Sequence, residues 1–212
     1  ATAELFRLMR SNLLFILNDP RDKVVLLTST SSGEGKSFIS INLAASLALL
    51  NKRVVLIGLD IRNPRLADYL DLHPRYGVTQ YLSSSDITVD QLIIPHPEVP
   101  DLDVICAGPV PPNPAELLLS EKVDELFRQL RTMYDYVIVD TAPIGLVSDT
   151  FTLDRVTDAA IYVCRTNYTS LSDLSLINDI FEQHRLKKVS LVINGSAANK
   201  TYGYGTKKSH HN

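Results

Sequence analysis

A segment rich in Ser and Gly, Thr28–Ser37, carries the clearest chemical pattern in the sequence. It ends in Gly-Glu-Gly-Lys-Ser and lies between a β-branched run and a stretch with helical spacing. Its glycines allow consecutive backbone N–H groups to turn inward, and the N-terminus of the following helix adds partial positive charge. In a loop of this kind Lys36 reaches the β- and γ-phosphates, and the Ser37 hydroxyl binds Mg²⁺. The segment is therefore predicted to bind the phosphates of ATP.

This loop departs from the usual pattern at one position. A glycine normally stands six residues before the lysine, where this sequence has Thr30. A Ser- and Gly-rich turn ahead of a helix is the alternative, but the strand–loop–helix context favours a phosphate loop. The residues expected to contact the nucleotide here are Ser32, Gly33, Glu34, Gly35, Lys36, Ser37 and Phe38.

Two carboxylates stand at the ends of predicted strands. Asp140 ends the apolar run Tyr136–Asp140, and at the carboxyl edge of a parallel sheet it can hold Mg²⁺ beside the phosphate loop. Asp60 ends a second run and is followed by Arg62 and Arg65. An Asp–Arg cluster is commonly only a surface ion pair, but ligand sites of α/β folds gather at this edge of the sheet. We therefore expect Asp60 to belong to the same site.

The positions of these residues depend on short apolar runs that alternate with stretches of helical periodicity. Most of the runs are apolar almost throughout, as expected for parallel strands covered on both faces. Predicted strands are Val24–Thr30, Arg53–Asp60, Leu102–Ala107, Tyr136–Thr141, Ala159–Arg165 and Val189–Asn194. Predicted helices are Ala3–Leu17, Ser37–Leu50, one that starts at Pro114, Glu121–Thr132 and Ser170–His184. This alternation predicts an α/β fold of the P-loop NTPase type, with a mostly parallel central sheet and helices on both faces.

Two polar residues are assigned to helix starts. Asn113 precedes Pro114 and suits the N-cap position, with Glu116 in the first turn. Asp149 closes the segment Thr141–Asp149, which we interpret as a switch-like loop. We expect Asp149 to cap a helix and not to take part in catalysis.

Composition limits the possible functions. The chain has 212 residues, a formal net charge of −3 and a pI near 5.9, which give no electrostatic reason to expect nucleic acid as a partner. Cys106 and Cys164 are expected to be buried, free thiols of a reducing compartment. The longest apolar run, Leu43–Leu50, is too short to cross a bilayer. We expect one domain over residues 1–198 and a flexible polar tail over residues 199–212.

Three motifs, in this order, resemble those of the bacterial protein-tyrosine kinases of capsule and exopolysaccharide export. They are Gly33–Ser37 (Gly-Glu-Gly-Lys-Ser), Asp60–Pro64 (Asp-Ile-Arg-Asn-Pro) and Asp140–Pro143 (Asp-Thr-Ala-Pro). The resemblance implies an ATP-dependent tyrosine autokinase that phosphorylates the C-terminal tail of a neighbouring subunit. The catalytic residues that it implies are Lys36, Asp60 and Asp140, the Mg²⁺ ligands are Ser37, Asp60 and Asp140, and Arg62 is a further nucleotide contact. One departure is Gly58, because the family usually has an Asp two residues before Asp60.

The two ends of the chain also resemble this family. Residues 1–18 contain Glu4, Arg7 and Arg10, which match a helix that mediates ring-shaped oligomerisation, and the tail contains the candidate phospho-acceptors Tyr202 and Tyr204. Spacing alone would also allow an exposed helical ion pair, and tyrosines in a Gly-rich tail can be incidental.

Asn194 ends the last predicted strand and is followed by Gly195. Related nucleotide-binding folds recognise adenine with an Asn at this place, so Asn194 is a candidate adenine contact. The alternative is an Asn-Gly turn.

The resemblance further implies partners and a location. These are other copies of the chain, a transmembrane activator or polysaccharide co-polymerase segment in the same or a separate polypeptide, and a cognate tyrosine phosphatase. The implied location is the cytoplasmic face of the bacterial inner membrane. Two rival functions share the fold: a regulatory ATPase of the partitioning and division-site class, and a nucleotide-binding scaffold without activity. The ATPases carry an additional Lys near the start of the phosphate loop, whereas Thr28–Gly35 contains none.

Overall fold

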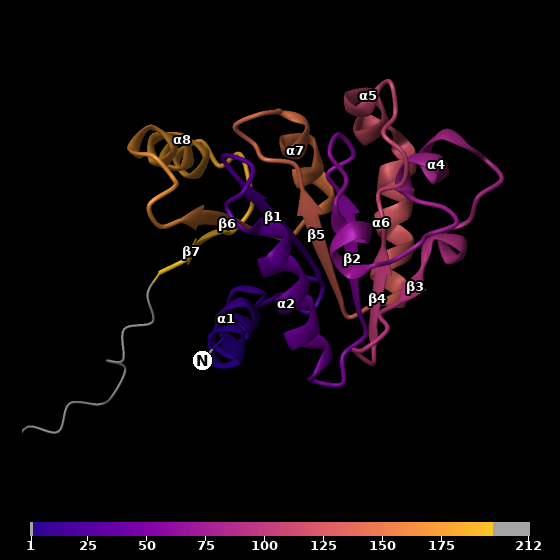
Figure 1. Cartoon of the computed structure of the whole chain (residues 1–212), viewed down its shortest axis with the longest axis horizontal. Coiled ribbons are helices and arrows are strands. Elements are labelled where there is room, and N and C mark those ends of the chain that lie inside the picture. The colour runs from indigo at the N-terminus through magenta and orange to yellow at the C-terminus, as the bar shows by residue number, and fades with distance from the viewer. Residues whose placement is uncertain (1, 197–212) are drawn as a thin grey trace, which may run out of the picture.

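The fold is built on one seven-stranded sheet with the strand order β3-β4-β2-β5-β1-β6-β7. The computed structural model describes residues 2–196 (Figure 1). The strands are β1 (Val24–Ser29), β2 (Val54–Leu59), β3 (Ile94–Pro95), β4 (Leu102–Ile105), β5 (Tyr136–Thr141), β6 (Ala159–Arg165) and β7 (Val189–Asn194). All neighbouring pairs are parallel except β3 with β4. The predicted, mostly parallel sheet is confirmed.

Helices cover both faces of this sheet, as predicted. They are α1 (Thr2–Ile16), α2 (Lys36–Ala48), α3 (Leu66–Leu70), α4 (Val78–Ser83), α5 (Pro114–Leu119), α6 (Glu121–Met133), α7 (Asp149–Thr152) and α8 (Leu171–Glu182), with 3₁₀ turns η1 (Val89–Leu92) and η2 (Leu153–Val156). Side chains of α1, α2 and α3 share one core with the sheet, and those of α4, α5, α6 and α8 share the other. Figure 1 shows α1 and α2 together on the same side of the sheet.

The central strands form because their side chains are apolar on both sides. Every residue of β1 and β2 is buried, which matches continuous apolar runs and not an alternating pattern. The parallel register places the C-terminal ends of β1, β2 and β5 at one edge: Leu27 pairs with Asp140, and Asp140 pairs with Gly58. The loops that follow these strands therefore meet at that edge.

The first helix buries only part of its apolar surface. Of the apolar side chains on α1, Phe6 and Leu13 are buried, whereas Leu5 and Leu8 are each 58% exposed. The helix packs on α2 near the open edge strand β7, so part of its apolar surface has no sheet beneath it.

Two further expectations can be compared with the structure. Cys106 and Cys164 are buried and free, as predicted. Within residues 2–196, no helix combines the length and the hydrophobicity that a membrane span requires.

Candidate active site

The phosphate loop joins β1 to α2, and its shape depends on two glycines. Gly33 has φ +87° and Gly35 has φ +92°, values that side-chain-bearing residues rarely adopt. A Cβ on Gly35 would also lie 2.0 Å from Asn194 Nδ2. Thr30, at the position where the usual pattern has glycine, is buried and its hydroxyl lies 2.6 Å from the hydroxyl of Tyr162. The glycines are thus placed where the backbone of this loop requires them.

Lys36 and Ser37 begin α2 and meet Asp140 from the end of β5. Ser37 Oγ donates a hydrogen bond of 2.7 Å to Asp140 Oδ2, and Lys36 Nζ lies 3.6 Å from Asp140 Oδ1. Asp140 is only 4% exposed, so both contacts operate at reduced dielectric. Strand pairing of β1 with β5 brings together residues that are about a hundred positions apart in the sequence.

Asp60 follows β2 at the same edge and approaches this group. Its Oδ1 accepts a hydrogen bond of 3.1 Å from the backbone N–H of Asn63. Burial raises the pKa of the Asp60 carboxyl, and the nearby Asp140 raises it further, while the Asn63 N–H and Lys36 act in the opposite direction. A carboxylate whose pKa is raised is a better proton acceptor at neutral pH than an ordinary aspartate.

These side chains line one pocket of about 600 Å³. It includes the loop residues from Ser31 to Phe38, together with Asp60 and Asp140. Three other residues line the pocket: Arg65, which the sequence singled out only as part of the Asp–Arg cluster, and Asn63 and Tyr69, to which it assigned no role. Arg65 forms no ion pair among the residues that the structure describes, so it is a cation available to a phosphate ligand.

Arg62 lies outside this pocket and pairs with Asp149, which changes the interpretation of Asp149. Arg62 Nε donates to Asp149 Oδ2 at 2.6 Å, and Arg62 does not line the phosphate pocket. The expectation that Asp149 caps a helix is wrong: Ser148 is the N-cap of α7, and the Asp149 carboxylate binds the guanidinium instead. The pair connects the loop after β2 to the loop after β5.

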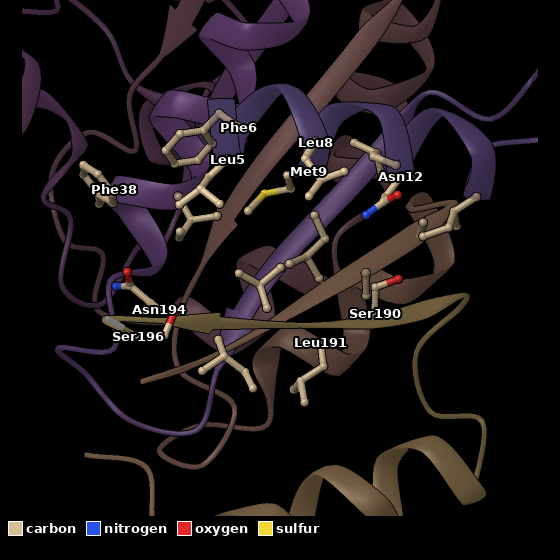
Figure 2. A pocket seen from close by; sticks show the side chains of 18 of the residues that line it. Leu5, Phe6, Leu8, Met9, Asn12, Phe38, Ser190, Leu191, Asn194 and Ser196 are labelled. Carbon is tan, nitrogen blue, oxygen red and sulfur yellow. The ribbon is translucent and has the colours of Figure 1, made fainter. Parts of the chain in front are cut away.

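Asn194 and Phe38 lie where the phosphate pocket meets a second, apolar groove. Asn194 Nδ2 donates to Glu34 O at 3.1 Å, so this side chain contacts the phosphate loop directly. Phe38 is half exposed and packs edge-on against Phe6, with ring centroids 5.9 Å apart. Figure 2 shows the groove, of about 780 Å³, between α1 and β7, with Phe38 and Asn194 at the same end.

Comparison with known proteins identifies the family. Residues 25–208 match the family model CbiA, the CobQ/CobB/MinD/ParA nucleotide binding domain. Tyrosine-protein kinase YwqD of Bacillus subtilis is 35% identical over 208 residues, which cover 97% of this chain and 87% of YwqD. The chain belongs to the bacterial tyrosine-protein kinases. The solved kinase domain of the Escherichia coli tyrosine kinase ETK superimposes with a TM-score of 0.86 at 27% identity, over 98% of this chain and 81% of that chain.

Some kinases of this family are much longer than the chain. Tyrosine-protein kinase ptk of Acinetobacter johnsonii is 35% identical over 191 residues, which are 90% of this chain but only 26% of that protein. The cell division ATPase MinD of Pyrococcus furiosus shares the fold, with a TM-score of 0.68 at 18% identity over 83% of this chain and 74% of that chain. Both the sequence identity and the TM-score are higher for the tyrosine kinases than for MinD. The kinase function is therefore favoured over the division-site ATPase that the sequence left as an alternative.

The three charged residues on α1 of the kinase domain do not form one cluster. Arg7 pairs with Glu4 at 2.9 Å on the exposed side of the helix. Arg10 instead donates to Ser46 O on α2 at 2.7 Å. Tyr202 and Tyr204 lie outside the described residues.

Proposed function

We propose that this chain is the catalytic domain of an ATP-dependent protein-tyrosine kinase that phosphorylates the C-terminal tail of a neighbouring subunit. The observation that carries the proposal is the meeting of Lys36, Ser37, Asp140 and Asp60 at one sheet edge, beside a loop shaped for phosphates. Membership of the tyrosine-kinase family supplies the reaction class.

The nucleotide would lie along the phosphate loop with its base toward the apolar groove. Backbone N–H groups from Ser32 to Phe38 and the Lys36 ammonium would bind the β- and γ-phosphates. On binding, Lys36 would exchange part of its contact with Asp140 for a phosphate. Arg65 would add positive charge in place of Arg62, which is already paired with Asp149. Phe38 and Asn194 flank the end of the groove where adenine would sit.

The residues present fit a magnesium ion. Ser37 Oγ and the Asp140 carboxylate are oxygen donors already in contact, and Mg²⁺ in phosphoryl-transfer sites takes one or two carboxylates together with phosphates and water. Within residues 2–196, no cluster of three or more His, Cys, Asp or Glu is arranged to hold a metal alone, as suits an ion that enters with its nucleotide. When bound, the ion would neutralise charge on the β- and γ-phosphates.

In the transfer step the tyrosine oxygen forms a bond to the γ-phosphorus while the bond to the β–γ bridging oxygen breaks, and ADP leaves. Asp60 would accept the hydroxyl proton, and its raised pKa suits that role. Lys36 and the loop amides would stabilise the charge that develops on the transferred group. Most of the catalysis would therefore come from positioning and electrostatics.

The acceptors in this proposal are Tyr202 and Tyr204 of an adjacent copy. A surface on α1 that includes Glu4 and Arg7 would hold that copy close and raise the local concentration of its tail to about millimolar. Arg10 would support this surface indirectly, because it ties α1 to α2.

The family resemblance supports a role in capsule or exopolysaccharide export at the cytoplasmic face of the inner membrane. In this setting a membrane-spanning co-polymerase segment would activate the kinase, and a tyrosine phosphatase would reset the tail.

The test is intact-mass spectrometry of the purified protein after incubation with Mg-ATP, before and after phosphatase treatment, followed by mapping of the modified residues. Phosphotyrosine at residues 202 and 204 is expected, and it should be absent from Lys36→Met and from Tyr202→Phe/Tyr204→Phe. Release of inorganic phosphate from ATP without any phosphotyrosine would contradict the proposal and favour a regulatory ATPase.

A further inference from the structure

The segment Arg165–Ser170, between β6 and α8, lies against the outer side of the phosphate loop. Tyr168 Oη donates to Ser32 O at 2.6 Å, and Arg165 Nη1 donates to Gly33 O at 2.9 Å. None of these groups takes part in the proposed reaction. Two successive carbonyls of the phosphate loop are thus held by side chains that approach from outside the pocket.

The next loop residue, Glu34, is held in the same way at two points. Its carbonyl accepts the amide N–H of Asn194 at 3.1 Å. The residue is 1% exposed, and its carboxylate is bonded on both sides: one oxygen accepts the Ser31 backbone N–H at 2.9 Å, and the other bonds to Thr169 Oγ1. A buried carboxylate facing the phosphates would repel them, but this one is directed away and bonded within the protein.

The hydroxyl of Thr169 has a defined direction. Thr169 Oγ1 accepts the backbone N–H of Arg165 at 2.7 Å, so its single proton is free to be donated to Glu34. The Arg165 guanidinium also lies over the Tyr168 ring, 5.4 Å from its centroid. The segment is therefore braced internally and can act as a fixed support.

The geometry of the peptide unit connects these outer contacts to phosphate binding. In a planar trans peptide the C=O of one residue points opposite to the N–H of the next. Holding the carbonyls of Ser32, Gly33 and Glu34 outward directs the N–H groups of Gly33, Glu34 and Gly35 toward the pocket. Three consecutive amides converge there to form an anion-binding concavity.

We propose that Tyr168 and Thr169 are positioning residues that fix the orientation of the phosphate-loop amides without contacting the nucleotide. The inference rests on the nucleotide site of the proposed function but not on tyrosine transfer. A loop held in its binding conformation does not have to be ordered by the ligand, so its affinity for phosphates is higher.

The test compares Tyr168→Phe/Thr169→Val with the wild type by calorimetric titration of Mg-ADP and by thermal unfolding without nucleotide. Each substitution removes a hydroxyl and keeps the shape of the side chain. The double variant loses three hydrogen bonds, of which two, from Tyr168 Oη to Ser32 O and from Thr169 Oγ1 to Glu34, hold the phosphate loop. Loss of these two bonds at ordinary net strength predicts a decrease in Mg-ADP affinity of about tenfold. In Tyr168→Phe the unfolding temperature without nucleotide should change little, because Tyr168 is half exposed. The double variant should be less stable, because Thr169→Val leaves the Arg165 N–H and one oxygen of the buried Glu34 carboxylate without this partner.

Two control variants make the result specific. Thr169→Ser keeps the hydroxyl and should restore affinity when paired with native Tyr168. Thr166→Val removes a hydroxyl from the same segment that makes no hydrogen bond among the described residues, and it should bind Mg-ADP like the wild type. If the double variant does not fold, Tyr168→Phe alone carries the test, with an expected loss of severalfold.

Unchanged affinity in the double variant would overturn the inference. So would an affinity loss in Tyr168→Phe matched by an equal fall in its stability without nucleotide, or an equal affinity loss in Thr166→Val. A wild-type protein that binds Mg-ADP but transfers no phosphate to tyrosine would refute the proposed function and leave this test valid, since the readout is binding.

Discussion

Replacement of Asp60 by Asn separates the two roles that this carboxylate can have. The amide keeps the size of the side chain and still offers an oxygen to the Asn63 N–H, which Asp60 Oδ1 accepts at 3.1 Å. It removes the negative charge and the ability to accept a proton from tyrosine. Asp60→Asn should therefore lower kcat strongly while Mg-ADP still binds.

The expected size follows from the role of a general base. Such a group contributes about 10²–10⁴-fold, which equals about 2.7–5.4 kcal/mol of barrier. In the wild type, protonation of Asp60 should produce an acidic limb in the pH profile of kcat/KM. Because burial raises the pKa of Asp60, this limb should lie above the pH at which an ordinary aspartate titrates, and it should be absent from the residual activity of Asp60→Asn.

Stability should change in the opposite direction to activity. The pKa of Asp60 is higher in the folded state than in the unfolded state, so the folded state binds the proton more tightly. The charged carboxylate therefore destabilises the fold once the pH has risen above its folded-state pKa. Asp60→Asn should be at least as stable as the wild type at pH 7, and this advantage should disappear as the pH falls toward the usual aspartate value.

The assays are steady-state tail phosphorylation, calorimetric titration of Mg-ADP and urea unfolding at several pH values. Lys36→Met serves as the control for loss of phosphate contact. An unchanged kcat in Asp60→Asn would refute the assignment of the base. A parallel fall in Mg-ADP affinity, together with a higher magnesium requirement, would show that Asp60 acts chiefly as a metal ligand.

Three further predictions concern charge. Lys36→Met should fold normally, by circular dichroism, and lose at least about 100-fold in phosphorylation rate, because a phosphate-facing cation is removed; near-normal labelling would contradict this. Asp158→Asn should lower the free energy of unfolding in urea by about 2–4 kcal/mol at pH 7. Burial alone would raise the pKa of Asp158, but Arg131 and two backbone N–H groups at the start of β1 lower it. The loss of stability should therefore shrink as the pH falls through the lowered pKa. A loss that does not depend on pH would refute this prediction. Glu4→Ala/Arg7→Ala should yield a monomer by light scattering, with normal Mg-ADP binding and slower tail phosphorylation. Full-rate labelling at every protein concentration would instead show transfer within one chain.

The parts of the fold that depend on continuous apolar runs could be predicted closely. The runs at Tyr136–Thr141, Ala159–Arg165 and Val189–Asn194 coincide with β5, β6 and β7, and the helix predicted to begin at Pro114 is α5. The short elements could not be predicted in this way. The strand β3 has two residues and α7 has four, too few to show a period, and both depend on tertiary contacts.

The residues of the candidate site likewise include some that a sequence pattern could predict and some that it could not. Lys36, Ser37 and Asp140 were recognisable because each follows or ends a predicted strand in a known pattern, and the structure brings them together. The partners of arginines were not recognisable. Arg62 contacts Asp149, which is 87 positions away, and Arg65 is left to line the pocket. These arginines are three positions apart in the sequence, and the turn after β2 determines which of them lines the pocket.

The residues around Gly58 in β2 give a physical reason to propose Asp60 as the group that accepts the proton. In the family pattern a further carboxylate stands at position 58, and Gly58 pairs in register with Asp140, so a side chain there would share its face of the sheet. A Cβ on Gly58 would lie 3.3 Å from Leu66 Cδ2, which is buried at the start of α3. Leu66 thus packs against the glycine and leaves little room for a carboxylate beside Asp140. Asp140 is engaged by Ser37 and Lys36, and the Glu34 carboxylate is bonded to Ser31 and Thr169. Asp60 is the remaining acid among the described residues that line the pocket, and burial disfavours its charged form. A single acid with a raised pKa can bind a proton more readily than either member of a fully ionised pair that is bound to a metal. In the proposed mechanism, glycine at position 58 therefore leaves the acid–base chemistry to Asp60.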